Sequence, residues 1–109
     1  MSITTFNRAD LAVTATATSI YGPVPVGTVA VVFSGTIANV DSTAKALHTC
    51  SVDIHNGATI ISRIKDIPIA YGSTSSIPKL VVKAGESVFV SADGTGGIYM
   101  SIEVLEVAG

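Results

Sequence analysis

The stretch HTCSVDIHNGATII (residues 48–61) holds the only cysteine of the chain, both of its histidines and an aspartate, so it decides between a reactive site and a plain β-hairpin. Side chains on a β-strand point alternately to the two faces of the sheet. A strand over 47–55 places His48, Cys50, Val52 and Ile54 on one face and Thr49, Ser51, Asp53 and His55 on the other. The valine and isoleucine mark the first face as buried, which predicts that the cysteine is a small core side chain.

The candidate ligands are therefore split across the sheet, which does not suit a metal site. His48 and Cys50 alone supply two ligands, whereas zinc takes three or four. A catalytic Ser–His–Asp or Cys–His set is recognised by geometry and not by spacing, but Asp53 and His55 lie two residues apart on what we expect to be a solvated strand face. We predict no catalytic, metal-binding or cofactor-binding residues, and no enzymatic activity.

The end of the same stretch predicts a turn. Asn56-Gly57 is typical of a type I′ β-turn, because both central residues of that turn need positive φ and these two residues tolerate it. The return strand is expected over 58–66. The opening stretch is thus interpreted as a β-hairpin.

The composition extends this interpretation to the whole chain. The sequence has 14 valines, 12 isoleucines and 12 threonines, against four leucines. β-branched side chains lose rotamer freedom in a helix and pack well on a pleated sheet. We therefore predict an all-β protein: a single antiparallel β-sandwich or jelly roll of seven to eight strands. A chain of 109 residues is one domain. We expect a sandwich over 11–109, preceded by an N-terminal arm (1–10) whose apolar and polar residues follow no clear period.

Alternation and turn residues locate further strands. The stretch LAVTATATSI alternates between apolar residues and Thr or Ser, which is typical of a half-buried strand. Gly35 predicts a bend or bulge inside a long strand, and prolines are expected at strand ends or edges because they cannot donate to a ladder. The expected strands beyond the hairpin are 11–20, 28–40, 79–93 with a tight turn at Ala84-Gly85, and 97–107.

Charge and hydropathy limit the kinds of partner. The net charge is −2, and the six basic residues are scattered instead of forming the cationic stripe that binds phosphates. We expect no direct nucleic-acid binding. The segment MSITTFNRAD does not resemble a secretory signal, and the longest apolar run, 29–33, is far too short to span a membrane. One cysteine cannot form an intrachain disulfide, which fits a reducing cytoplasm.

Apolar residues exceed what a monomeric sandwich can bury. In the closing strand, Tyr99, Leu105 and Val107 lie on the face opposite the expected core side. Residues 28–33 likewise carry apolar side chains on both faces. Exposed apolar patches usually mark contact surfaces, so we expect self-association or binding to a larger lattice. The interface residues predicted from the sequence are Phe6, Tyr99, Leu105 and Val107.

Three segments carry a resemblance to a known family. The pieces IPIAYGS (67–73), IPKLVVKAGESVFV (77–90) and MSIEVLE (100–106) resemble small β-sandwich proteins of tailed-bacteriophage virions, and the likeness spans roughly residues 33–107. Such proteins serve as head decoration (cement) proteins or as parts of the neck, tail or fibre attachment. The resemblance implies a non-enzymatic virion protein, assembled in the host bacterial cytoplasm, that contacts itself and other virion proteins. It brings no catalytic or ligand residues.

Among these roles the sequence favours a capsid decoration protein that stabilises the phage head and binds the major capsid protein. A tail, neck or fibre-attachment subunit remains open. A glycan or host-surface binding module remains a further alternative, and its aromatic platform would have to come from Tyr21, Tyr71 and Tyr99, because the chain has no tryptophan.

Overall fold

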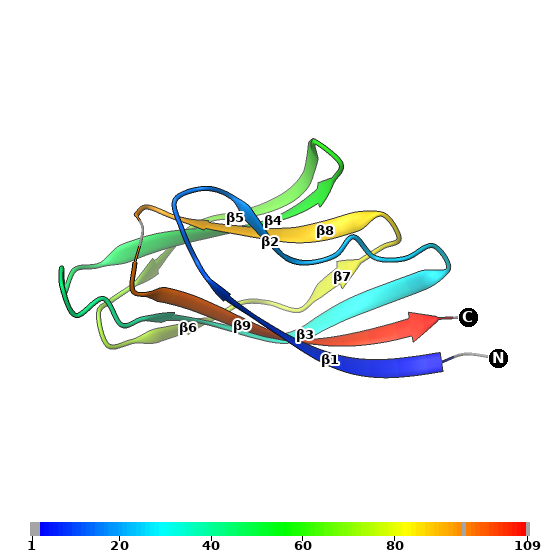
Figure 1. Ribbon diagram of the computed structural model, residues 1–109, viewed down its shortest axis with the longest axis horizontal. Coiled ribbons are helices and arrows are strands. Elements are labelled where there is room, and N and C mark those ends of the chain that lie inside the picture. Colours follow the sequence, from blue (N-terminus) through cyan, green and yellow to red (C-terminus); the bar gives the residue numbers. More distant parts are fainter. Residues whose placement is uncertain (1–2, 95, 109) are drawn as a thin grey trace.

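The computed structural model describes residues 3–94 and 96–108, and in these residues the secondary structure is entirely β. Two antiparallel sheets pack face to face (Figure 1). Sheet A has the order β1-β9-β3-β6, with β7 also paired to β3, and sheet B has the order β2-β8-β4-β5. The strands are β1 (Ile3–Ala12), β2 (Thr18–Tyr21), β3 (Thr28–Asn39), β4 (His48–Asn56), β5 (Thr59–Ile69), β6 (Thr74–Ser76), β7 (Leu80–Val82), β8 (Glu86–Ala92) and β9 (Ile98–Ala108).

This order is that of a jelly roll, so the predicted fold class is confirmed. The strand number differs from the expected seven to eight, because nine strands are assigned in the described part of the chain. The additional strand arises where the edge of sheet A is broken: β6 and β7 both pair with β3, and Ile77, Pro78 and Lys79 separate them. Proline cannot donate a ladder hydrogen bond, so it interrupts this edge as expected.

The core lies between the two sheets and consists almost entirely of β-branched side chains. The central strands of sheet A, β3 and β9, alternate between buried and exposed positions; in β3, Ala30 and Val32 are buried and Val29 is exposed. The largest fully buried side chains are Val13, Val32, Ile37, Val52, Ile69, Val82, Val88, Val90, Ile98, Met100, Ile102 and Val104. Burial of this one face of each sheet is what fixes the register of the strands.

The N-terminal region differs from the prediction. Residues 3–10, expected to form an arm, belong to β1 and pair with β9 without a break, whereas Met1 and Ser2 lie outside the described residues. The predicted strand 11–20 is wrong over 13–17. There Val13 N–H donates to Ile98 O and Thr14 O accepts from Ala92 N–H, so the chain crosses from sheet A to sheet B.

Two local features are also shifted. The bulge in β3 lies between Val32 and Ser34 and not at Gly35, which instead packs against Ile77. The β4–β5 turn is formed by Gly57 and Ala58, and Asn56 is the last residue of β4, paired with Thr59. Only Gly57 has a positive φ, of 61°. The predicted type I′ turn at Asn56-Gly57 is therefore wrong, and glycine at the first central position fits a type II′ turn.

Candidate functional site

The outer face of sheet A carries a row of apolar side chains that crosses four strands. The ladder places Phe6 of β1 opposite Leu105 of β9, Leu105 opposite Val31 of β3, and Val31 opposite Val81 of β7. Directly opposed residues share one face of a sheet. Their neighbours along the strands, such as Val104 and Val82, are buried in the core, so this row points away from it. Phe6 is 70% exposed and Val81 is 52% exposed.

Further apolar side chains widen this row into a continuous surface. Val107 lies opposite Val29 in the next outward-facing row, and both are exposed. On the other side, the exposed ring of Phe33 contacts the ring of Phe6 edge-to-face, with 5.9 Å between centroids. Phe33 lies on the same outward side as Val29 and Val31, from which it is separated by even numbers of residues. The apolar face, as we call it, comprises Phe6, Val29, Val31, Phe33, Val81, Leu105 and Val107.

The structure places all four sequence-predicted interface residues on the outer side of sheet A. Phe6, Leu105 and Val107 belong to the apolar face itself, while Tyr99 lies at the far end of β9, 51% exposed. The sequence did not identify Val81 as part of this surface. Only the pairing of β7 with β3 brings it there, and no local pattern predicts that pairing.

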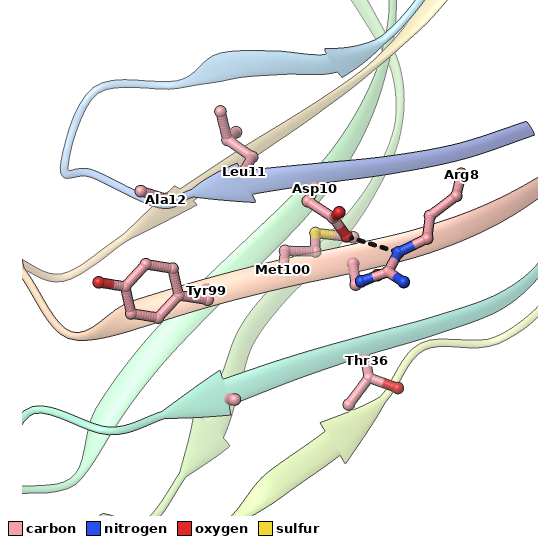
Figure 2. A pocket seen from close by; sticks show the side chains of 9 residues that line it. Arg8, Asp10, Leu11, Ala12, Thr36, Tyr99 and Met100 are labelled. Atoms are coloured by element: carbon pink, nitrogen blue, oxygen red, sulfur yellow. Dashed lines mark hydrogen bonds and ion pairs between the residues drawn. The ribbon is translucent and has the colours of Figure 1, made fainter.

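Two shallow hollows follow the apolar face along β9. One, of about 410 Å³, is lined by Phe6, Phe33, Arg8, Ser101, Glu103 and Asn7. The next, also about 410 Å³, extends from the Arg8–Asp10 ion pair to Tyr99 (Figure 2). The two hollows share Arg8 and Ser101, so they adjoin each other on the outer side of sheet A.

The outer side of β4 in sheet B is polar, and its centre is not the solvated surface expected from the sequence. Asp53 is only 4% exposed. Arg63, directly opposite on β5, donates from Nε to Oδ1 at 3.0 Å and from Nη2 to Oδ2 at 3.2 Å. His55 stacks on Phe89 with 4.2 Å between centroids, and its Nε2 lies 3.5 Å from Asp53 Oδ2. The carboxylate and histidine thus belong to a covered structural cluster.

Replacing Arg63 by alanine is expected to lower the melting temperature by about 5 °C, because it leaves the buried Asp53 carboxylate without its cationic partner. Arg63→Lys should recover only part of the loss, since lysine cannot donate two parallel hydrogen bonds. Thermal unfolding followed by circular dichroism measures the effect. Lys65→Ala, an exposed site on the same strand, is the matched control. Equal losses in the two alanine variants would show that the Asp53 pair does not stabilise the fold.

His48 has a structural role that the sequence did not predict. Its Nδ1 lies 2.5 Å from Asp93 Oδ1 and its Nε2 lies 2.9 Å from Asp41 Oδ2. These hydrogen bonds raise the pKa of His48, and the same contacts lower the pKa of both Asp41 and Asp93. Both ring nitrogens of His48 bind carboxylates. Neither nitrogen is hydrogen-bonded to a hydroxyl or thiol of the described residues, as the base of a nucleophile would be. The two carboxylates lie on opposite sides of the ring, so the three groups cannot share one ion.

Cys50 is buried in the core, as predicted, and burial raises the pKa of its thiol to about 11. Such a thiol is neither a good nucleophile nor a good metal ligand at neutral pH. Within residues 3–94 and 96–108, no group of three or more His, Cys, Asp or Glu side chains could hold a metal ion. The same residues include no helix long and apolar enough to cross a membrane.

The three tyrosines do not form an aromatic platform. Tyr21 packs against the core, and burial raises the pKa of its hydroxyl to about 12. Tyr71 and Tyr99 are exposed on separate segments. The aromatic contacts in the described part of the chain are the Phe6–Phe33 and His55–Phe89 pairs.

Comparisons with known proteins agree on the fold. No protein-family model matches the chain, and no curated protein matches it in sequence. A chain from Bacillus endospore appendages, described as a novel family of disulfide-linked pili, superposes with a TM-score of 0.60 at 15% identity, covering 98% of this chain and 87% of that one. A chain from the acid-stable capsid of Helicobacter pylori bacteriophage KHP30 superposes with a TM-score of 0.54 at 10% identity, covering 98% and 91%. The fold is shared.

A third solved structure, of infectious bursal disease virus Gx strain, matches with a TM-score of 0.46 at 7% identity, covering 97% of this chain and 32% of that chain. Likeness at that level supports no argument. The two better matches show that the same jelly-roll architecture occurs in proteins of a pilus and of a phage capsid.

Proposed function

We propose that the protein is a non-enzymatic structural subunit of a virion, and specifically a capsid decoration (cement) protein that binds the shell through its apolar face. The observation that carries the proposal is the cross-strand row Phe6–Leu105–Val31–Val81, which lies on the outer side of sheet A. The proposed interface thus includes Phe6, Leu105 and Val107 of the sequence prediction, with Tyr99 at its margin.

The physical reason is the exposure of this surface to water. An antiparallel sheet with one solvated face normally alternates apolar and polar residues, as the central strand β4 of sheet B does here. Sheet A has apolar side chains on both faces instead, and a contiguous exposed patch of this kind marks a contact surface. The adjoining hollows at Arg8 and Tyr99 offer space for side chains of the bound protein.

The comparisons and the family resemblance support this role at different levels. Two solved structures with the same fold come from assemblies of many subunits, a pilus and a phage capsid. The pilus is described as disulfide-linked. This chain has one cysteine, Cys50, which is 1% exposed, so assembly here relies on non-covalent surfaces. The likeness of residues 33–107 to tailed-phage virion proteins favours a virion over a pilus.

The partners that follow are the major capsid protein and further copies of this chain, with assembly in the cytoplasm of the host bacterium. The same apolar face also fits a tail, neck or fibre-attachment protein, because fold alone does not select the position in a virion. The test therefore uses capsid shells and isolated tails of the encoding phage side by side.

Val81→Glu is expected to weaken binding to capsid shells by at least about tenfold, because a carboxylate would be buried in the interface without a partner. Co-sedimentation with purified shells that lack the protein measures this affinity. Val26→Glu is the matched control: this valine is 96% exposed on the loop between β2 and β3, outside the apolar face.

Three results would contradict the proposal. Wild-type protein that binds neither shells nor tails would remove the virion role altogether. Binding to tails but not to shells would replace cement with the tail or neck role. Equal binding by the Val81→Glu and Val26→Glu variants would show that a different surface makes the contact.

A further inference from the structure

The edges of the two sheets differ in how well they are protected against pairing with another chain. Natural edge strands are usually short, bulged or interrupted by proline. Among the described strands, β2 has four residues and a register shift, and β6 and β7 have three residues each. β5 has two register shifts, a proline at position 68 and a positive φ of 56° at Asp66. Each of these three edges is therefore poorly suited to pairing with a strand of another chain.

The fourth edge, β1, has none of these features. It is ten residues long, contains neither proline nor glycine, and pairs with β9 in an unbroken register from Ile3 to Ala12. Within the described residues β9 is its only ladder partner. Peptide groups alternate along a strand, so about half of the N–H and C=O groups of β1 point away from β9. A regular row of unpaired groups is a template for another strand.

We propose that β1 pairs antiparallel with β1 of a second copy, about a twofold axis that passes through Ala9. The charges on the strand select this register. Arg8 and Asp10 both lie on the outer side of sheet A, as Phe6 does, because they are separated from it by even numbers of residues. With Ala9 opposite Ala9, each Arg8 faces Asp10 of the second copy, which gives two opposite-charge pairs.

Neighbouring registers are less favourable. Continuity of the sheet faces requires that the axis pass through a residue pair, so the next choices centre on Arg8 or on Asp10. Either choice places two like charges directly opposite each other, which destabilises a sheet. A centre on Asn7 leaves both charges opposite uncharged residues. Only the Ala9 register pairs both charges, and it places two small side chains at the axis.

The resulting dimer has a continuous sheet with the apolar faces of both copies on one side. A twofold contact is closed, so it ends at two copies and does not extend into a fibre. The inference goes beyond the proposed function, because it concerns the edge of β1 and does not depend on which protein covers the apolar face. The side chains of Arg8 and Asp10 are exposed, at 70% and 57%, and are free to exchange their internal ion pair for one between copies.

A charge swap tests the register. Arg8→Asp alone and Asp10→Arg alone should each weaken dimerisation by about tenfold or more, since two attractive pairs become repulsive. An equimolar mixture of the two variants should form a heterodimer, because every acidic residue then faces an arginine. The double variant, Arg8→Asp with Asp10→Arg, should dimerise like the wild type. Sedimentation equilibrium measures all four samples, and circular dichroism verifies that each is folded.

A disulfide tests the position of the axis. Opposed residues of an antiparallel pair have Cα atoms about 4.5–5.5 Å apart, which suits a disulfide. Ala9→Cys should therefore form a cross-linked dimer on oxidation, whereas Thr5→Cys should not, because the two copies of position 5 would lie eight residues apart. The native Cys50 is buried and does not compete.

A wild-type protein that remains monomeric at its highest soluble concentration would overturn the inference. So would single charge variants that dimerise like the wild type, a mixture that stays monomeric, or a Thr5→Cys variant that cross-links as readily as Ala9→Cys. Val81→Glu should leave dimerisation unchanged while it reduces shell binding. Failure of the edge pairing and failure of the proposed shell contact are thereby distinguished.

Discussion

Replacing Gly35 by valine is expected to lower the free energy of unfolding by about 1–3 kcal/mol, as overpacking of a well-filled core does. A Cβ atom at this position would lie 2.4 Å from Ile77 Cγ1 and 3.3 Å from Ile102 Cγ2. Gly35 is not among the residues with positive φ, so its backbone would accept a β-branched residue. The expected loss therefore comes from the collision and not from backbone strain.

Shortening Ile77, the residue with which Gly35→Val would collide, leaves a cavity instead of overpacking the core. Ile77 is 8% exposed, and its N–H donates to Gly35 O at 3.1 Å, so its side chain fills the space above the glycine. Ile77→Ala alone should cost about 2–5 kcal/mol through the cavity that it leaves. Combined with Gly35→Val, the cost should be clearly smaller than the sum of the two, because the valine occupies part of that cavity. Urea unfolding of the three variants measures the coupling. Strictly additive costs would show that the two residues do not share this space.

Alternation predicted those strands whose core-facing side is mainly apolar. It located 28–39 and 98–108 nearly to the residue, because burial of one face imposes a period of two. It missed β1, where Thr5 and Asn7 lie on the same side as Ala9 and Leu11 but only the latter two pack against the core. The regular alternation over 13–17 was misleading, since that segment crosses between the sheets.

Contacts that depend on an irregularity could not be predicted. A two-residue turn at Gly57-Ala58, continued without interruption, would place Asp53 opposite Ser62. The register shift between Ile54 and His55 places it opposite Arg63 instead. The ion pair between Asp53 and Arg63 thus depends on a bulge that no residue of the hairpin sequence predicts. The apolar face was found in part, because two of its strands show an apolar excess by themselves, but its full extent needs the register of four strands.

The contacts of His48 with two carboxylates distant in the sequence could not be predicted either, but they imply that the stability of the fold depends on pH. The contribution of His48 to stability should be complete below the ordinary imidazole pKa of 6.5 and should be lost as the pH rises through the raised pKa of the folded protein. Asp41 and Asp93 have lowered pKa values, so their contribution is complete above the ordinary value of 3.8 and is lost as the pH falls through the lowered values. The contacts should therefore stabilise the fold most between about pH 4 and 6.5.

The physical reason lies in the donors of the ring. An imidazolium donates from both nitrogens, whereas a neutral imidazole donates from one and turns a lone pair toward the remaining carboxylate. Asp41 also accepts from the N–H groups of Thr43 and Ala44, and Asp93 accepts from Thr49 N–H. His48 thus connects the loop after β3 to the turn before β9. Loss of its proton is expected to loosen both.

Melting temperatures recorded from mildly acidic to alkaline pH test this in the wild type and in His48→Gln. The wild type should lose several degrees more than the variant over this range, because glutamine carries no titrating charge. The difference between the two curves excludes the contribution of His55, which both proteins retain. Asp41→Asn should move the wild-type decline to lower pH, since the ring then keeps a single carboxylate. Parallel curves for the wild type and His48→Gln would mean that the imidazolium does not hold the two loops together.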